Sequence, residues 1–257
     1  MTEKRFAFIG AGALGFHLTV AFKKSGQQVV QIISRSTREG QALANEVDAI
    51  YSKCPEDIID SVTHIILTLP DQAINEVLPR LPKRNSVVIH TSGSFPMSYL
   101  GMNSTNFGVL YPLQTFSKDF VPTWEEIPFF LEASSKEVES DLLELVGELG
   151  ASGILLNSER RKKLHLAAVF ASNFTNYMQG KAQKLISEIG LSDDLIRPLV
   201  VETIRKAYEL GAEGAQTGPA RRGDHDTIKK HLDLLSCCAN DKNLYRIISN
   251  SISDEYE

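Results

Sequence analysis

The sequence predicts an α/β protein in which a doubly wound parallel sheet of Rossmann type is followed by an all-α C-terminal domain. In the first 157 residues, short β-branched or aromatic runs alternate with helix-like stretches, and a glycine-rich turn joins the first run to the first helix. These runs are apolar throughout, whereas a strand with one solvent-facing side alternates apolar and polar residues. This pattern is typical of a parallel sheet that helices cover on both faces.

Strands and helices are predicted in turn along this first part of the chain. The predicted strands are residues 6–9, 28–33, 64–69, 87–90, 108–110, 129–132 and 153–156. The predicted helices are residues 14–25, 37–47, 72–81 and 136–149, and the last of them ends at Gly150.

After Asn157 the strand signals end and only helices are predicted. Ser158 is the predicted N-cap of a helix with no breaker before Gly180, which extends as far as Gly190. Further helices are predicted at 198–210, 226–238 and 240–251. We therefore expect a Rossmann-like cofactor-binding domain at 1–157 and an all-helical substrate and dimerisation domain at 158–257.

Composition limits the partners and the compartment. The 257 residues include 27 Lys and Arg against 32 Asp and Glu, a net charge of −5, so we expect no nucleic-acid and no anionic-membrane partner. The three cysteines, Cys54, Cys237 and Cys238, match neither a disulfide framework nor a metal-ligand spacing, which favours no metal and a cytoplasmic location. No apolar run approaches the ~18–20 residues that span a bilayer.

A glycine-rich turn is the strongest motif. It reads Gly10-Ala11-Gly12-Ala13-Leu14-Gly15, after a predicted strand and before a predicted helix. In a dinucleotide site the first glycine permits the tight turn, the second lets the backbone approach a pyrophosphate, and the third allows close packing of helix on strand. The alternative is a turn without a ligand. The surrounding βαβ pattern favours the dinucleotide site.

The end of the second predicted strand indicates which dinucleotide binds. An NAD site places Asp or Glu there, whereas this chain has Ser34, Arg35 and Ser36. A guanidinium group pairs with the 2′-phosphate of NADP, and the two hydroxyls can bond its other oxygens. We therefore predict NADP as the cofactor. The alternative is an arginine that is simply solvated in a loop.

The remaining cofactor contacts are predicted from topology. Ligands of a doubly wound sheet lie beyond the carboxyl ends of its strands, so Leu69 and Pro70 after one strand and Thr91 and Ser92 after another should flank the nicotinamide and its ribose. Ser92 could also be only a turn residue.

Reduction of a carbonyl or imine needs a proton donor, and the long helix carries one imidazole, His165. At 100° per residue, His165, Ser172, Asn176 and Gln179 share one face of this helix, with Asn173 about 80° away. We expect this polar stripe to face the nicotinamide, with His165 as acid/base and Asn173 as an orienting donor. The alternative is that these residues are hydrogen-bonded core residues or helix contacts.

With these residues considered, the chain resembles a family of NADP-dependent oxidoreductases that have a Rossmann-like N-terminal domain and a helical C-terminal domain of unknown function. The resemblance spans nearly the whole chain. It is carried by GAGALG at 10–15, HTSG at 90–93, YPLQTF at 111–116, HLAAVFASN at 165–173, TGP at 217–219 and RGD at 222–224. The family looks related to the 6-phosphogluconate, β-hydroxyacid, ketopantoate and pyrroline-5-carboxylate reductases, whose helical domains usually build the dimer. The resemblance therefore implies a homodimer formed through the helical domain.

The sequence also departs from these relatives. Where some of them pair a catalytic lysine with an asparagine one turn later, Asn173 matches the asparagine but Val169 replaces the lysine. His165 holds a more distant position, where ketopantoate reductases carry lysine, and Tyr111 stands where the family is expected to carry histidine. The chemistries of the relatives therefore cannot be transferred directly.

The function expected from these observations is hydride transfer between NADP(H) and a small carbonyl, hydroxy or imine compound. A protein that binds NADP(H) without catalysis and acts as a sensor is the main alternative. A reductase that uses a deazaflavin beside NADP is a third possibility.

Overall fold

The computed structural model describes residues 3–236 and 238–256 and divides the chain into two compact units, Met1–Tyr177 and Met178–Glu257. Residue 157, where we predict the boundary between the functional domains, is the last residue before helix α5 (Ser158–Ala168), whereas the first compact unit continues to Tyr177.

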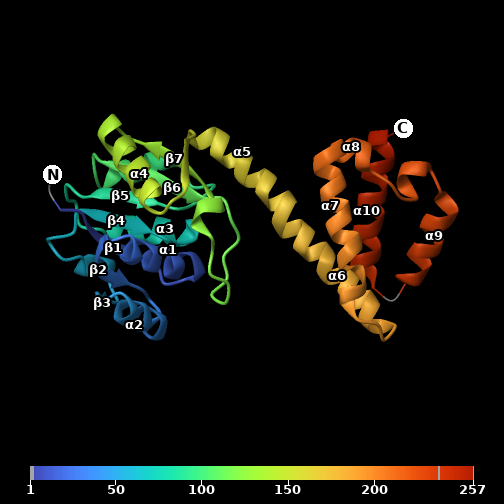
Figure 1. Ribbon diagram of the computed structural model, residues 1–257, viewed down its shortest axis with the longest axis horizontal. Helices are drawn as coiled ribbons and strands as arrows, with labels where there is room; N and C mark the ends of the chain where they lie inside the picture. Colours follow the sequence, from blue (N-terminus) through green and yellow to red (C-terminus); the bar gives the residue numbers. More distant parts are fainter. Residues whose placement is uncertain (1–2, 237, 257) are drawn as a thin grey trace. The chain divides into compact units, whose positions relative to one another are not determined.

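The described part of the first unit contains an eight-stranded sheet with the strand order β3-β2-β1-β4-β5-β6-β7-β8 (Figure 1). Neighbouring strands are parallel except for β6 and β7, which pair antiparallel. The strand order reverses direction at β1 and β4, which is where ligands of such sheets bind. The predicted fold class is confirmed. The strands are β1 (Arg5–Ile9), β2 (Gln28–Ile33), β3 (Ile50–Ser52), β4 (His64–Leu67), β5 (Val87–His90), β6 (Phe107–Pro112), β7 (Pro128–Ala133) and β8 (Ser152–Leu155).

Helices account for most of the remaining described chain, and none of them is both long and apolar enough to cross a membrane. The other helices are α1 (Ala13–Lys24), α2 (Thr37–Glu46), α3 (Asp71–Val77), α4 (Lys136–Glu148), α6 (Thr175–Glu188), α7 (Arg197–Leu210), α8 (Ala212–Ala215), α9 (His225–Leu234) and α10 (Ala239–Tyr256).

The apolar strand runs arise because both faces of the sheet are buried. Phe6 and Phe8 of β1 pack against Phe22 of α1 on one face of the sheet. Their ring centroids lie 5.2 and 5.3 Å from that of Phe22. Ala7 and Ile9, the residues of β1 that alternate with these, belong to the core on the opposite face. Each strand of the central sheet therefore needs apolar residues at consecutive positions.

One predicted helix ends early as an α-helix, and one strand is absent from the prediction. The predicted helix at 72–81 is an α-helix only to Val77 and continues as a 3₁₀ turn, Leu78–Arg80, because Pro79 has no N–H for an α-helical hydrogen bond. Strand β3 is missing from the prediction because three residues are too few to show a periodic pattern.

The N-cap of α5 also differs. Asn157 caps the helix, since its Oδ1 accepts a hydrogen bond of 3.0 Å from the backbone N–H of Arg160. Ser158 was the predicted cap, but its hydroxyl donates to Oε2 of Glu132 at 2.7 Å and accepts from the backbone N–H of Met97 at 3.2 Å. Ser158 therefore ties the start of the helix to the sheet.

The predicted long helix is interrupted by a π-helical segment, Val169–Phe174, between α5 and α6. In a π-helix the hydrogen bonds run from i to i+5, so each residue turns through less than 100°. The polar stripe that we predicted from a uniform 100° rotation is therefore wrong beyond Val169. Such segments in an α-helix are often found at functional sites.

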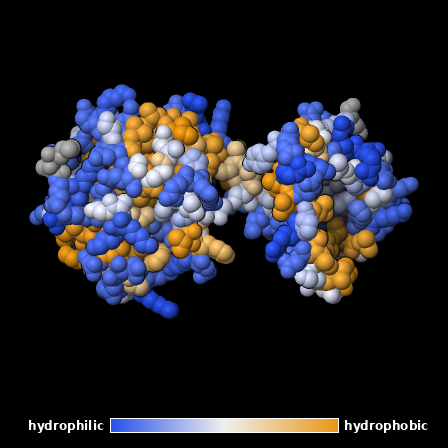
Figure 2. Space-filling view, viewed as in Figure 1, coloured by the Kyte–Doolittle hydropathy of each residue, from blue (hydrophilic) through white to orange (hydrophobic). Residues whose placement is uncertain are grey.

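The helical unit has almost no core within one chain. Among its described residues only Ala220 and Ser249 are buried, although the unit has about 80 residues. Figure 2 shows apolar residues, in orange, on the surface of this unit. Its exposed large apolar side chains are Leu185, Ile189, Leu191, Leu195, Leu199, Val201, Ile204, Tyr208, Leu210, Leu234, Ile247 and Ile248.

Candidate functional site

A cavity of about 330 Å³ lies beyond the carboxyl ends of β1, β2 and β4 in the first unit. This is the region that doubly wound sheets use for nucleotides. The cavity brings together residues that the sequence predicts to bind the cofactor from three separate segments. Its lining includes Gly10, Ala11, Gly12, Ser34, Arg35, Ser36, Leu69 and Pro70.

Each of the three glycines of the turn is required for a different structural reason. Gly10 has φ +115°, and a Cβ there would lie 2.4 Å from the carbonyl oxygen of Thr68. A Cβ at Gly15 would lie 2.3 Å from the carbonyl oxygen of Gly10, so this glycine allows α1 to approach the turn. A Cβ at Gly12 would meet no atom within 4 Å. Nothing in the described chain therefore fills the space beside Gly12.

The first turn of α1 fits an anionic group. Gly12 is the N-cap, so no side chain caps the helix, and the first turn carries no acidic residue. Its backbone N–H groups and the positive end of the helix dipole therefore remain available for an anion. Ala13 and Leu14, the next two residues of the motif, begin this helix. A pyrophosphate has both the charge and the acceptor oxygens that this position requires.

The segment after β2 forms another part of the cavity wall. Ser34 is buried, and its carbonyl oxygen accepts a hydrogen bond of 3.0 Å from the hydroxyl of Tyr51. Arg35 and Ser36 are exposed; the Arg35 side chain is 81% exposed, with Nη1 3.7 Å from Oε2 of Glu76. Because this ion pair is long and exposed, the guanidinium group can turn to an anionic ligand.

Lys53 also lines this cavity, directly after β3. Lys53 is absent from the predicted site because strand β3 is absent from the predicted sheet. A basic residue directly after a short strand is the signal that could have identified it.

The segments after β4 and β5 place the other predicted cofactor residues. Leu69 and Pro70 line the cavity. Thr91 is buried, and its hydroxyl donates to the carbonyl oxygen of Leu67 at 3.2 Å. The Ser92 hydroxyl donates to Asp71 and accepts from the backbone N–H groups of the two residues that follow Gly93. The side chain of Ser92 therefore stabilises its own turn.

His165 of α5 lies against the loop that follows β5. Its Nδ1 is 3.0 Å from the hydroxyl of Tyr111, the fifth residue of β6. A Cβ at Gly93 would lie 2.6 Å from Nδ1 of His165 and 2.8 Å from Cζ of Tyr111. Gly93 therefore allows both rings to pack against the loop. From the sequence, Tyr111 was noted as a departure from the histidine expected in the family, and its pairing with His165 was not predicted.

Arg161, one turn before His165, fixes α5 on the sheet. Its side chain is fully buried, pairs with Glu132 of β7 and donates to the carbonyl oxygen of Phe95 at 2.6 Å. Burial and the nearby Arg161 cation lower the pKa of His90 to about 3, so this imidazole is neutral at physiological pH. Burial raises the pKa of Tyr111, although the same cation opposes that shift.

Asn173 lies eight residues beyond His165, in the π-helical segment, and is exposed. Eight residues extend roughly 12 Å along a helix, so the structure does not bring these two residues together. Leu166, Phe170 and Phe174 of the same stretch are exposed as well.

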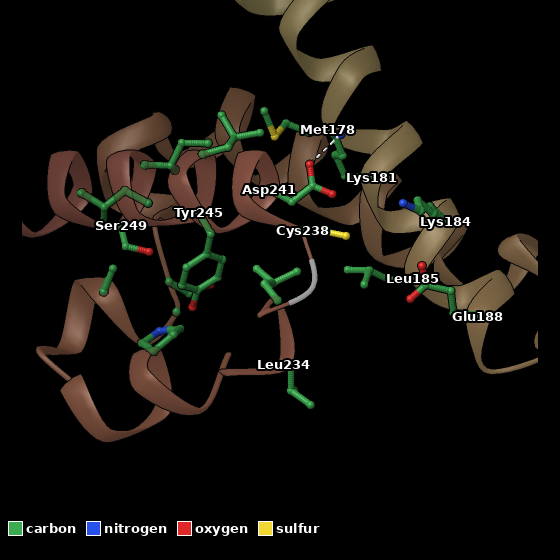
Figure 3. Close-up of a pocket in the computed structure, with 18 residues that line it drawn as sticks. Met178, Lys181, Lys184, Leu185, Glu188, Leu234, Cys238, Asp241, Tyr245 and Ser249 are labelled. Carbon is green, nitrogen blue, oxygen red and sulfur yellow. Dashed lines mark hydrogen bonds and ion pairs between the residues drawn. The ribbon is translucent and has the colours of Figure 1, made fainter. Parts of the chain in front are cut away.

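A second cavity, of about 300 Å³, lies within the helical unit (Figure 3). Its wall is mainly apolar, and Lys181 and Asp241 form an ion pair of 2.7 Å in it. The described residues of the chain hold no group of three or more His, Cys, Asp or Glu that could bind a metal ion.

Two family models match the chain in succession. The model described as NADP oxidoreductase, coenzyme F420-dependent, matches residues 5–93, which contain the glycine turn and the loop with Gly93. A model described as a domain of unknown function, DUF2520, matches residues 127–252. No curated protein matches the chain.

Solved structures show the same fold over nearly the whole chain. An imine reductase from Myxococcus stipitatus, solved with NADP+, matches with a TM-score of 0.70 at 15% identity and covers 97% of this chain and 92% of its own. A Thermotoga maritima protein matches with a TM-score of 0.66 at 22% identity and covers 97% of both chains. A Bacteroides fragilis protein assigned as an NADP oxidoreductase matches with a TM-score of 0.90 at 37% identity over 98% of both chains. The chain therefore belongs to this family of NADP oxidoreductases, which confirms the predicted family and the predicted NADP cofactor.

Proposed function

We propose that this NADP oxidoreductase transfers a hydride between NADP(H) and an unidentified small carbonyl, hydroxy or imine compound. The position of His165 carries the proposal. Its imidazole packs on Gly93, in the loop after β5, at the sheet edge where the glycine turn also lies. A titratable imidazole at that edge is suited to give or take the proton that accompanies hydride transfer.

The cofactor would be held by four segments. Residues 10–15 and the first turn of α1 receive the pyrophosphate, for which the open space at Gly12 is suited. Ser34, Arg35 and Ser36, which line the cavity, receive the 2′-phosphate. Leu69 and Pro70, which also line it, and Thr91 and Ser92, which follow β5, flank the nicotinamide and its ribose. NADPH supplies a hydride from C4 of its nicotinamide. In this assignment His165 is the acid/base. Asn173, which is exposed eight residues further along the helix, is an orienting donor for a part of the bound ligand that lies away from His165.

Transfer of an isotope label tests the reaction. NADPH deuterated at C4 is incubated with the protein and a panel of small aldehydes, ketones and cyclic imines, and the products are analysed by mass spectrometry. Label in one product class supports the proposal, and His165→Ala should lower its rate at least tenfold. Saturable NADPH binding without label in any compound would favour the sensor alternative.

Cofactor preference tests the role of Arg35. Loss of a charge-assisted contact to the 2′-phosphate costs about 1.5–3 kcal/mol, so Arg35→Ala should weaken NADPH binding about 10- to 100-fold and leave NADH binding unchanged. Arg38→Ala is the matched control, because Arg38 is exposed only three residues further on, in the first turn of α2, but does not line the cavity. Equal NADPH affinity of the two variants would contradict this assignment.

We also propose a cytoplasmic homodimer formed through the helical domain. The near absence of buried side chains supports it, because a unit of this size needs a core to remain folded. On α7, Leu199 and Tyr208 are 67% and 88% exposed. Leu199→Glu combined with Tyr208→Glu should convert the dimer to monomer in multi-angle light scattering, whereas Lys229→Glu on α9 should not. A monomeric wild-type protein at micromolar concentration would exclude the dimer.

A further inference from the structure

The ring pair of Tyr111 and His165 is held by packing from several sides. Tyr111 is only 8% exposed, and its ring centroid lies 5.9 Å from that of His165 in an edge-on arrangement. Gly93 contacts both rings, and the buried Arg161 fixes the turn of α5 that precedes His165. The hydroxyl of Tyr111 and Nδ1 of His165 therefore have little freedom to separate from their distance of 3.0 Å.

The direction of this hydrogen bond follows from the burial of the phenol. Because burial raises the pKa of Tyr111, the phenol keeps its proton at neutral pH. Among the described residues, Nδ1 of His165 is the hydrogen-bond partner of this hydroxyl. A buried O–H group that lacks an acceptor is unfavourable, so the phenol donates and Nδ1 accepts.

A neutral imidazole that accepts at Nδ1 carries its hydrogen on Nε2. His165 is half-buried, and none of the hydrogen bonds among the described residues involves its Nε2. The two nearby carboxylates have partners already: Glu132 pairs with Arg161, and Asp71 accepts from Ser92 and Ser94. The tautomer that accepts from Tyr111 therefore presents an Nε2–H donor, and these two positions supply no unpaired carboxylate.

Building on the proposed function, we propose that Tyr111 is a positioning residue that holds His165 as its Nε2–H tautomer, and that the substrate is an aldehyde or ketone whose oxygen accepts the Nε2 hydrogen bond. A preorganised N–H donor stabilises the negative charge that develops on a carbonyl oxygen during reduction. A protonated imine is a cation with a hydrogen to donate, and it would need an acceptor or a carboxylate in this position.

The proton transfers of this step balance. The C=O π bond breaks as the hydride from NADPH, with its two electrons, bonds to the carbonyl carbon, and NADP+ remains. The carbonyl oxygen takes the proton of His165 Nε2, and the Tyr111 proton moves to Nδ1, so the imidazole stays neutral. The phenolate left on Tyr111 is in the electrostatic field of Arg161 and regains a proton from solvent. The product is an alcohol.

Nitrogen NMR of the full-length protein, labelled with 15N in its histidine rings, tests the tautomer without a substrate. At mildly alkaline pH the His165 resonances, assigned by their loss in His165→Gln, should show a protonated Nε2 and an unprotonated Nδ1. In Tyr111→Phe this pattern should change to a mixture of tautomers. A wild-type His165 protonated on Nδ1, or a spectrum that Tyr111→Phe leaves unchanged, would overturn the proposal.

A second tyrosine and histidine pair in the chain provides a matched control. Nδ1 of His231 lies 2.7 Å from the hydroxyl of Tyr245, in the helical unit. Tyr245→Phe should alter the His231 resonances and leave those of His165 unchanged. If Tyr245→Phe altered His165 as much as Tyr111→Phe does, the effect would not be specific to the Tyr111 contact and the proposal would fail.

The deuterium panel tests the substrate class. Label should appear in the alcohols formed from aldehydes or ketones, at a rate at least tenfold lower in Tyr111→Phe, with unchanged NADPH affinity. Label in the amines from cyclic imines, with the carbonyl compounds unlabelled, would overturn the proposal. Absence of NADPH binding contradicts the proposed function instead, and the NMR result still decides the tautomer.

Discussion

Replacing the buried guanidinium group of Arg161 should destabilise the first unit more than any exposed charge replacement. Arg161→Met keeps the volume and the apolar stem but removes the bonds to Glu132 and to the Phe95 carbonyl. Breaking a buried ion pair by removal of one partner usually costs about 3–5 kcal/mol, because the other charge is left buried.

The structure places this variant near the lower end of that range. The Glu132 side chain is 16% exposed, and it keeps the hydrogen bond of 2.7 Å from Ser158. We therefore expect a loss of about 3 kcal/mol in the free energy of unfolding. With a urea m-value of about 2 kcal/mol/M, the midpoint of unfolding should fall by about 1.5 M.

Fluorescence of the single tryptophan, Trp124, measures this transition, because it lies in the first unit with its ring centroid 5.9 Å from that of Phe129. Arg80→Met is the control: Arg80 forms an exposed ion pair with Glu56, and its loss should leave the midpoint unchanged. The double variant with Glu132→Gln should regain part of the loss. The error of such a comparison is roughly 0.3 M. If the midpoint for Arg161→Met differs from the wild-type value by less than this, the stabilising role of Arg161 is refuted.

Two further predictions concern the glycine turn and His90. Gly12→Ala should weaken NADPH binding at least tenfold without lowering the melting temperature, because a Cβ at Gly12 meets no atom of the described chain. Gly10→Ala should lower the melting temperature, because a Cβ at Gly10 meets backbone atoms. NADPH titration and calorimetry measure the two effects, and the reverse pattern would contradict the site. Because the pKa of His90 is about 3 in the folded chain and ordinarily 6.5, the unfolded chain binds a proton first as the pH falls. The free energy of unfolding should therefore decrease as the pH falls from 6.5 to 3, and this decrease should be smaller in His90→Gln. If the urea midpoints of the two proteins change in parallel across this range, His90 does not contribute to the pH dependence.

The sheet could be predicted from the sequence because burial on both faces requires runs of consecutive apolar residues, which are visible in the sequence. Strand β2 matches its prediction at both ends, since four of its six residues are Val or Ile and the strand is bounded by a turn and by Ser34. The antiparallel pairing of β7 with β6 could not be predicted from such runs, because strand direction depends on how the connecting chain packs.

The candidate site could be predicted only where it is local in sequence. The glycine turn and Arg35 lie within 26 residues, and a single βαβ unit determines their relative positions. Tyr111 and His165 are 54 residues apart and meet because Arg161 ties α5 to β7. Nothing in either local segment encodes that contact, which requires knowledge of where α5 packs.

The polar stripe shows a limit of a different kind. Hydrophobic periodicity indicates which side chains are expected to avoid water, but it does not indicate which surface covers them. Between His165 and Met178, the apolar residues Leu166, Phe170 and Phe174 are 57%, 62% and 48% exposed. The helical unit has the same property along α7. An apolar helix face that its own chain leaves exposed is the expected pattern for a core completed by a second copy, and the light-scattering experiment on Leu199 and Tyr208 tests that explanation directly.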